Sequence, residues 1–176
     1  MSKYFEAECG PGLPVVLENY RWLADALSEE SLFRKVERLS AEITDNPVDA
    51  HFLLHRAIAY GHLGEVDGTM QDYAQVIKLC PDDPKVYYAR GATLLDRGQL
   101  NAAIRDFDRA TELDPSHADA YYRRGIARMH LGQYRRAVQD FDHFISLNPE
   151  HEFVHYDRRV AADRATGGDE GLAWPA

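Results

Sequence analysis

Prolines recur at a fixed interval along this chain: Pro47, Pro81, Pro115 and Pro149 each lie 34 residues after the one before. A period of about 20 to 50 residues is typical of small structural units stacked side by side in an array. It is not typical of a fold that closes around one core. We therefore expect a protein that presents a large surface to partners.

Other residue types recur with the same 34-residue step. Glycines, aromatic residues and leucines form columns in register with the prolines, at Gly64, Gly98 and Gly132, at Tyr73, Phe107 and Phe141, and at Leu79, Leu113 and Leu147. A further column holds the small residues Ala57, Gly91 and Gly125. Together the columns define three complete repeats, at residues 50–83, 84–117 and 118–151.

Each repeat is predicted to form two helices. In the middle repeat, Tyr87 and Gly91 are four residues apart, which places them on one helical face. Gly98 permits the left-handed backbone that ends this helix. Residues 100–113 carry a second apolar stripe, which stops before Pro115. The small-residue column predicts that the two helices of a repeat approach each other closely there.

The run Tyr121-x2-Arg124-Gly125, followed by Ala137-x3-Phe141 and Pro149, resembles the tetratricopeptide repeat, a helix–turn–helix unit of about 34 residues. The resemblance implies an all-α fold, a right-handed α–α superhelix or solenoid of antiparallel helix pairs. The chain departs from the family at two columns. The family's tryptophan is replaced by Leu53, Tyr87 and Tyr121, and its leucine before the glycine by Arg56, Arg90 and Arg124.

The segments outside the three repeats complete the predicted organisation. Residues 15–47 carry two amphipathic patterns and are predicted to form a degenerate helical hairpin that covers the first repeat. Residues 152–166 continue the period and are predicted to be a capping helix. Residues 1–14 and 167–176 contain several glycines and prolines, and we expect both ends of the chain to be flexible.

Composition excludes several classes of function. The net charge is −9 and no basic stripe is present, so we expect no nucleic-acid partner. No run of about 18 apolar residues exists, so we expect no membrane insertion. The N-terminus lacks the pattern of a secretory signal, and two cysteines, Cys9 and Cys80, form no disulfide framework. These observations favour a cytoplasmic location.

One motif imitates a metal site. His151-Glu-Phe-Val-His155 matches the H-E-x-x-H pattern of zinc peptidases, but no histidine follows to supply a third ligand. The motif also crosses the predicted end of the third repeat. We therefore expect no metal site, no cofactor and no enzyme activity, since no nucleophile motif or phosphate-binding loop is present either.

Charged columns predict contacts between helices. Arg56, Arg90, Arg124 and Arg158 recur with the period, and so do Asp72, Asp106 and Asp140. A half-buried arginine needs a partner, because a stranded charge destabilises the fold. We predict that each aspartate pairs with the arginine of the next repeat, and that Arg56 pairs with Glu37. The alternative is that each arginine extends to water.

The resemblance also implies where a partner binds. In the family, the free side of each first helix lines a concave groove that holds peptides. We call the corresponding residues here the groove face: His51, Leu54, His55, Ile58, Lys85, Tyr88, Ala92, Leu95, Tyr122, Arg123, Ile126, Met129 and Tyr156. Phe153 belongs to the same side of the capping helix. The groove face contains a ladder at the 34-residue step, made of Leu54, Tyr88, Tyr122 and Tyr156, which suits apolar side chains of a partner. Alternatively, these tyrosines pack between repeats.

Three functions fit these observations. The first is an adaptor, a protein-interaction module that binds a peptide segment in the groove. The second is a secretion chaperone that holds a secreted hydrophobic protein. Small acidic proteins with three such repeats resemble the chaperones of type III secretion. The third is a structural unit that self-associates as a homo-oligomer. The clamp by which some family members grip chaperone tails is not expected, because Leu54 and Asp119 stand where that clamp needs cations.

Overall fold

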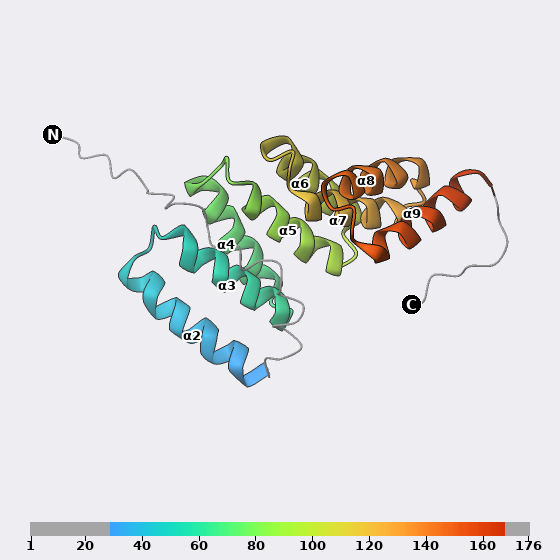
Figure 1. The fold of residues 1–176 in the computed structure, drawn as a ribbon. Coiled ribbons are helices and arrows are strands. Elements are labelled where there is room, and N and C mark those ends of the chain that lie inside the picture. The colour runs from blue at the N-terminus through green and yellow to red at the C-terminus, as the bar shows by residue number, and fades with distance from the viewer. Residues whose placement is uncertain (1–28, 168–176) are drawn as a thin grey trace. The chain divides into compact units, whose positions relative to one another are not determined.

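The structure, a computed structural model, describes residues 29–167 of the chain. They form the helices α2 (Glu29–Asp45), α3 (Ala50–Leu63), α4 (Val66–Leu79), α5 (Pro84–Asp96), α6 (Leu100–Leu113), α7 (Ala118–His130), α8 (Tyr134–Leu147) and α9 (Glu152–Ala165) (Figure 1). No strand occurs within this part of the chain. The prediction of an all-α fold is confirmed.

Each predicted repeat holds two of these helices. Residues 50–83 contain α3 and α4, residues 84–117 contain α5 and α6, and residues 118–151 contain α7 and α8. The predicted capping helix corresponds to α9, and the second arm of the predicted N-terminal hairpin corresponds to α2. The first arm of that hairpin and the two predicted flexible ends lie outside the described residues, except Gly167.

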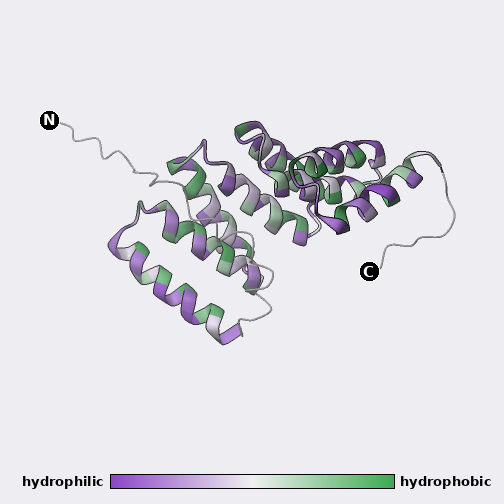
Figure 2. Ribbon diagram, in the orientation of Figure 1, coloured by the Kyte–Doolittle hydropathy of each residue, from purple (hydrophilic) through white to green (hydrophobic). Residues whose placement is uncertain are grey.

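The chain divides into two compact units, one up to Thr93 and one from Leu94 onward, so that the division falls within α5. In Figure 2, hydrophobic and hydrophilic residues alternate around the helices. This is the pattern expected of helices that bury one side and expose the other.

Turns follow the chemistry of the repeated residues. The Asp49 side chain accepts a hydrogen bond from the backbone N–H of His51 at 2.9 Å, which caps the start of α3. Gly98 and Gly132 have φ of 71° and follow α5 and α7. This left-handed backbone was predicted for Gly98, and it lets the chain reverse into the second helix of the repeat.

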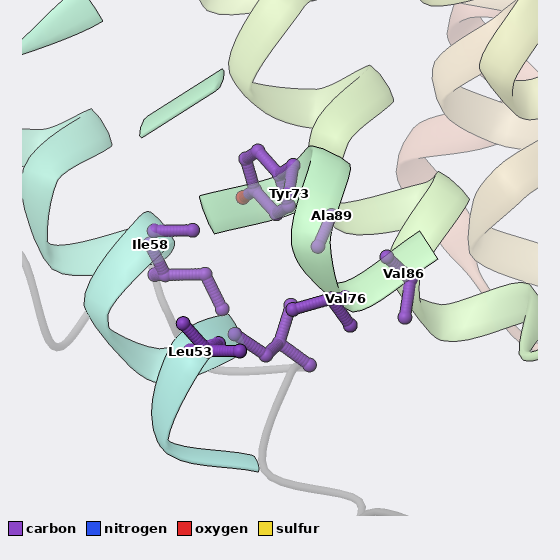
Figure 3. Packing of buried hydrophobic residues seen from close by; sticks show 8 residues of the cluster. Leu53, Ile58, Tyr73, Val76, Val86 and Ala89 are labelled. Atoms are coloured by element: carbon purple, nitrogen blue, oxygen red, sulfur yellow. The ribbon is translucent and has the colours of Figure 1, made fainter. Parts of the chain in front are cut away.

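In the first unit, the core is a cluster of buried side chains from α3, α4 and α5 (Figure 3). Leu53, Tyr73, Val76 and Val86 in this cluster are fully buried. The Tyr73 hydroxyl lies 3.1 Å from Oγ1 of Thr93, so its polar end has a hydrogen-bonding partner. α2 packs against α3 from the other side through Leu32, Val36 and Leu39, which are also buried.

In the second unit, the core lies between α7, α8 and α9. Phe141, Phe144 and Val154 are buried there. A Cβ atom at Gly125 would lie only 2.6 Å from Cε1 of Phe141. The close approach predicted at the small-residue column is therefore present between α7 and α8.

Cys80, which is buried next to the end of α4, is disulfide-bonded. A single bond is not the disulfide framework that the sequence argues against, and the spacing of two cysteines carries no information about it. The other cysteine of the chain, Cys9, lies outside the described residues.

Candidate functional site

Arg56 and Arg124 each pair with the column aspartate of their own repeat, so the predicted pairing with the next repeat is wrong. Arg56 donates from Nε and Nη2 to the two carboxylate oxygens of Asp72, each at 2.7 Å. Its Nη1 donates to the hydroxyl of Ser40 on α2 rather than to Glu37. The two helices of one repeat are antiparallel neighbours, which brings residues 16 apart face to face.

A larger network of the same kind holds α6, α7 and α8 together. Arg124 donates to Asp140 at 2.7 Å and, looking back along the chain, to Asp108 at 2.7 Å. Arg128 donates to the second carboxylate oxygen of Asp140, also at 2.7 Å. Arg158 on α9 pairs with Asp142 rather than with Asp140. Arg56, Arg124 and Arg158 therefore bridge neighbouring helices.

The groove face of the first unit is partly buried. Leu54 is 2% exposed and Tyr88 7% exposed, and Ile58 is also buried. Leu54 and Ile58 belong to the core cluster of this unit, so these three side chains offer little surface to a partner. The remaining predicted residues of this unit, His51, His55, Lys85 and Ala92, are half-buried.

The two histidines of the groove face lie together on α3. The rings of His51 and His55 are 4.3 Å apart and meet edge to face. Burial, together with the charges of His51 and Lys35, lowers the pKa of His55 to about 4. His55 is therefore neutral at pH 7, where it acts as a polar but uncharged part of the surface.

In the second unit, Tyr122 is turned toward α9 instead of toward open solvent. Its hydroxyl donates to Asp157 at 2.9 Å, and its ring lies 5.5 Å from that of Phe144. Burial raises the pKa of the Asp157 carboxyl, although the hydrogen bond from Tyr122 and the charge of His151 oppose this shift.

The other residues of the groove face in this unit differ in exposure. Met129 is buried, while Leu95, Arg123 and Ile126 are half-buried. Tyr156 on α9 is 48% exposed, and the guanidinium of Arg159 lies 5.5 Å from its ring centre. Of the four residues of the ladder, Tyr156 is therefore exposed and Leu54 and Tyr88 are buried. The fourth, Tyr122, is hydrogen-bonded to Asp157.

Two pockets open on the second unit, next to the groove face. The larger one, about 420 Å³, is lined by Gly132, Gln133, Tyr134, Arg135, Arg136, Arg164 and Ala165. The smaller one, about 170 Å³, is lined by Ile126, Met129, His130, Tyr134 and Arg164. The sequence analysis did not predict either pocket. A departure from the repeat does mark the larger one: Arg135 and Arg136 stand where the second repeat has Asn101 and Ala102 and the first has Asp67 and Gly68.

The H-E-x-x-H motif is spread over a turn and a helix. His151 precedes the first residue of α9, where it serves as the N-cap position, and Nε2 of His155 lies 3.4 Å from the carbonyl oxygen of Pro149. Among residues 29–167, no group of three or more histidine, cysteine or acidic side chains is placed to hold a metal ion. Within the same range, no helix is long and apolar enough to cross a membrane.

Sequence models of the tetratricopeptide repeat match residues 52–83, 73–105 and 91–165 of the chain. No curated protein matches the sequence.

Solved structures resemble the fold. A crystal structure of MamA aligns with a TM-score of 0.71 at 18% identity, over 89% of this chain and 87% of that one. The Arabidopsis OM64 TPR domain aligns with a TM-score of 0.60 at 24% identity, over 65% of this chain and 94% of that one. The first TPR of Spaghetti (RPAP3) bound to the HSP90 peptide SRMEEVD aligns at 0.63 and 23% identity, over 66% of this chain and 93% of that one.

Proposed function

Because the chain belongs to the tetratricopeptide repeat family, we propose that it is a non-catalytic interaction module that binds a peptide segment of a partner protein. Members of this family are generally interaction modules, and stacked repeats leave one side of each first helix available to a ligand. The proposed binding surface is the exposed part of the groove face, which lies on α9.

One observation carries this proposal. Phe153 on α9 is 76% exposed and Tyr156, three residues later, is 48% exposed. Residues three apart lie on the same face of a helix, so the two rings form one aromatic patch. Large aromatic side chains left in solvent often mark an interaction surface, and aromatic anchors commonly supply much of the binding energy.

The peptide of the Spaghetti (RPAP3) complex is not the ligand that we propose. Three of the positions that correspond to the clamp of the family, Leu54, Ile58 and Ala89, are buried apolar residues in this chain. A buried apolar position offers no cation to a carboxylate. The exposed surface on α9 instead favours a segment that inserts apolar side chains.

A selection from a displayed peptide library tests the proposal. Peptides enriched on the wild-type chain should bind the double variant Phe153→Ala/Tyr156→Ala at least about tenfold more weakly, since truncating an aromatic anchor typically costs more than about 1 kcal/mol. The matched control is Phe33→Ala, which removes a similarly exposed ring from α2. Equal affinity for wild type and double variant would contradict the proposal.

Light scattering over a range of concentrations separates this function from self-association. A chain that binds peptides through a free surface should remain monomeric, and the double variant should have the same mass as the wild type. A larger particle that is lost in Phe153→Ala/Tyr156→Ala would instead indicate that the aromatic patch joins copies of this chain.

A further inference from the structure

The two pockets of the second unit form one composite site. Both are lined by Tyr134 at the start of α8 and by Arg164 near the end of α9. The guanidinium of Arg164 lies 5.7 Å from the ring centre of Tyr134, and its Nη1 lies 3.4 Å from the Tyr134 hydroxyl. Tyr134 and Arg164 therefore form the shared wall between the pockets.

The larger pocket is strongly cationic. Arg135, Arg136 and Arg164 line it, and no acidic residue is among its lining residues. No salt bridge joins Arg135 or Arg136 to a carboxylate within the described part of the chain. The net charge of the protein is −9, so the charge of this pocket is opposite in sign to that of the chain as a whole.

The start of α8 adds to the same charge. The first turn of α8 has no acidic residue, and its N-cap residue Gln133 makes no side-chain capping hydrogen bond. The first N–H groups of a helix are not used within the helix, and they place partial positive charge at this end. The positive charges of Arg135 and Arg136 are unfavourable beside this partial positive charge, and a carboxylate bound there would offset both.

The smaller pocket has a different chemistry. Ile126, Met129 and the ring of Tyr134 line it, with His130 and Arg164 at its edge. A ligand that fills both pockets must therefore carry negative charge on one part and an apolar side chain a short distance away. Ile126 and Met129 also belong to the groove face.

We propose that residues 168–176 of this same chain bind in the composite site, as an internal ligand. Their sequence is Gly-Asp-Glu-Gly-Leu-Ala-Trp-Pro-Ala, in which two acidic residues precede Leu172 and Trp174. The carboxylates of Asp169 and Glu170 fit the arginine pocket, and Leu172 or Trp174 fits the apolar pocket.

The connection is short enough for this. Ala165 lines the larger pocket, and Asp169 follows it by four residues. An extended chain spans at most about 3.3–3.6 Å per residue, so these four residues can cover up to about 14 Å. The segment remains tethered to the site, and tethering raises its effective concentration there. Because the apolar pocket shares Ile126 and Met129 with the groove face, residues 168–176 would compete with a partner peptide.

NMR of the isotopically labelled full chain tests the inference. The sequence has two tryptophans, so the indole N–H signal of Trp174 is identified by its loss in Trp174→Phe. We expect this signal to differ from that of a synthetic peptide with the sequence 168–176. In Arg135→Gln/Arg136→Gln it should move most of the way to the position of the free peptide. The matched control, Arg34→Gln/Arg38→Gln, removes two arginines from α2 and should leave the signal unchanged.

A charge exchange makes the test specific. The acidic-side variant Asp169→Lys/Glu170→Lys should release Trp174, and so should Arg135→Glu/Arg136→Glu. Combining the two sets should return the signal toward its wild-type position. A Trp174 signal identical to that of the free peptide in the wild-type chain would overturn the inference. So would release by the α2 control variant, or a bound signal that depends on protein concentration, which would mean binding to a neighbouring copy. Peptide binding through Phe153 and Tyr156 is tested by its own variant, Phe153→Ala/Tyr156→Ala, so failure of either proposal can be told from failure of the other.

Discussion

Of the two glycines in the third repeat, Gly125 is the one that has no space for a side chain. An added Cβ would lie 2.6 Å from Cε1 of Phe141 and 3.0 Å from its Cδ1. Phe141 is fully buried, so its ring has no free volume into which to move. The first repeat accommodates an alanine at the equivalent position, Ala57, in the same buried cluster as Tyr73.

We therefore expect Gly125→Ala to lower the free energy of unfolding by about 1–3 kcal/mol, because a methyl group forced into a packed core displaces its neighbours. Urea denaturation followed by circular dichroism measures this change. The control is Gly61→Ala in α3, where the new Cβ would lie 3.4 Å from a methyl group of Thr93. That substitution should be neutral or stabilising by up to about 1 kcal/mol. Equal effects of the two substitutions would contradict the prediction.

Residue identity alone predicted the turns but not the surface. Gly98 was expected to adopt a left-handed conformation, and its φ of 71° agrees. Tyr88, in contrast, was expected to contact a ligand and is 7% exposed. A glycine reports its own backbone conformation, whereas the exposure of a tyrosine depends on neighbouring helices that the local sequence does not specify.

At the scale of whole helices, ion pairs explain how α6, α7 and α8 keep their relative positions. Asp140 on α8 is almost fully buried and accepts hydrogen bonds from both Arg124 and Arg128 on α7. Asp108 on α6 accepts from both arginines as well. The pair between Arg158 and Asp142 is built from the same residue types but is exposed to solvent.

We expect Asp140→Ala to cost about 3–5 kcal/mol of stability, because it leaves two partly buried guanidinium groups without their main counter-charge. Asp142→Ala removes a carboxylate from an exposed pair, and it should cost less than about 1 kcal/mol. Chemical denaturation of both variants against wild type gives the comparison. Similar costs at the two positions would mean that burial does not determine the strength of these pairs.

The periodic sequence identified these columns but not their pairing, for a geometric reason. Asp72 lies 16 residues after Arg56 and 18 residues before Arg90, so a 34-residue period brings both arginines close to the same aspartate in sequence. The choice depends on which helix faces the carboxylate. The structure places Arg56 against Asp72 within one helix pair, and this orientation is a property of packing that column spacing does not contain.

At the scale of the molecule, each of the two units contains a buried cluster of its own. One contains Leu53, Tyr73 and Val76 in the first unit, and the other contains Phe141 and Phe144 in the second. In proteins made of stacked repeats, stability is approximately a sum of local and nearest-neighbour terms. A defect in one cluster should therefore act mainly on the helices next to it.

Hydrogen exchange can measure this locality. We expect Leu53→Ala to destabilise its surroundings by about 2–5 kcal/mol and to accelerate amide exchange in residues 50–80. Exchange in residues 134–165 should change much less. Phe144→Ala is the reciprocal variant and should give the opposite pattern. Equal acceleration throughout the chain in either variant would show that the protein unfolds as a single cooperative unit.

The repeat period was enough to predict the all-α fold and the family, because the columns repeat three times in register. It was not enough to predict the pockets beside α8. Arg135 and Arg136 break the period, and Arg164 reaches them from α9 only after the chain has folded. Features shared by the repeats are readable from the sequence, whereas features made by one repeat and its neighbour depend on tertiary structure.

Arg124 and Asp142 belong to the same repeat, and they give it complementary ends. Arg124 forms an ion pair with Asp108 of the second repeat, and Asp142 forms one with Arg158 of α9. An in-frame tandem duplication of the third repeat would thus recreate this contact at the new junction without any further mutation. The first repeat could not be extended in this way, because Ala74 stands where the aspartate is needed. Duplication of the third repeat would therefore give an added repeat that already carries both residues of this ion pair.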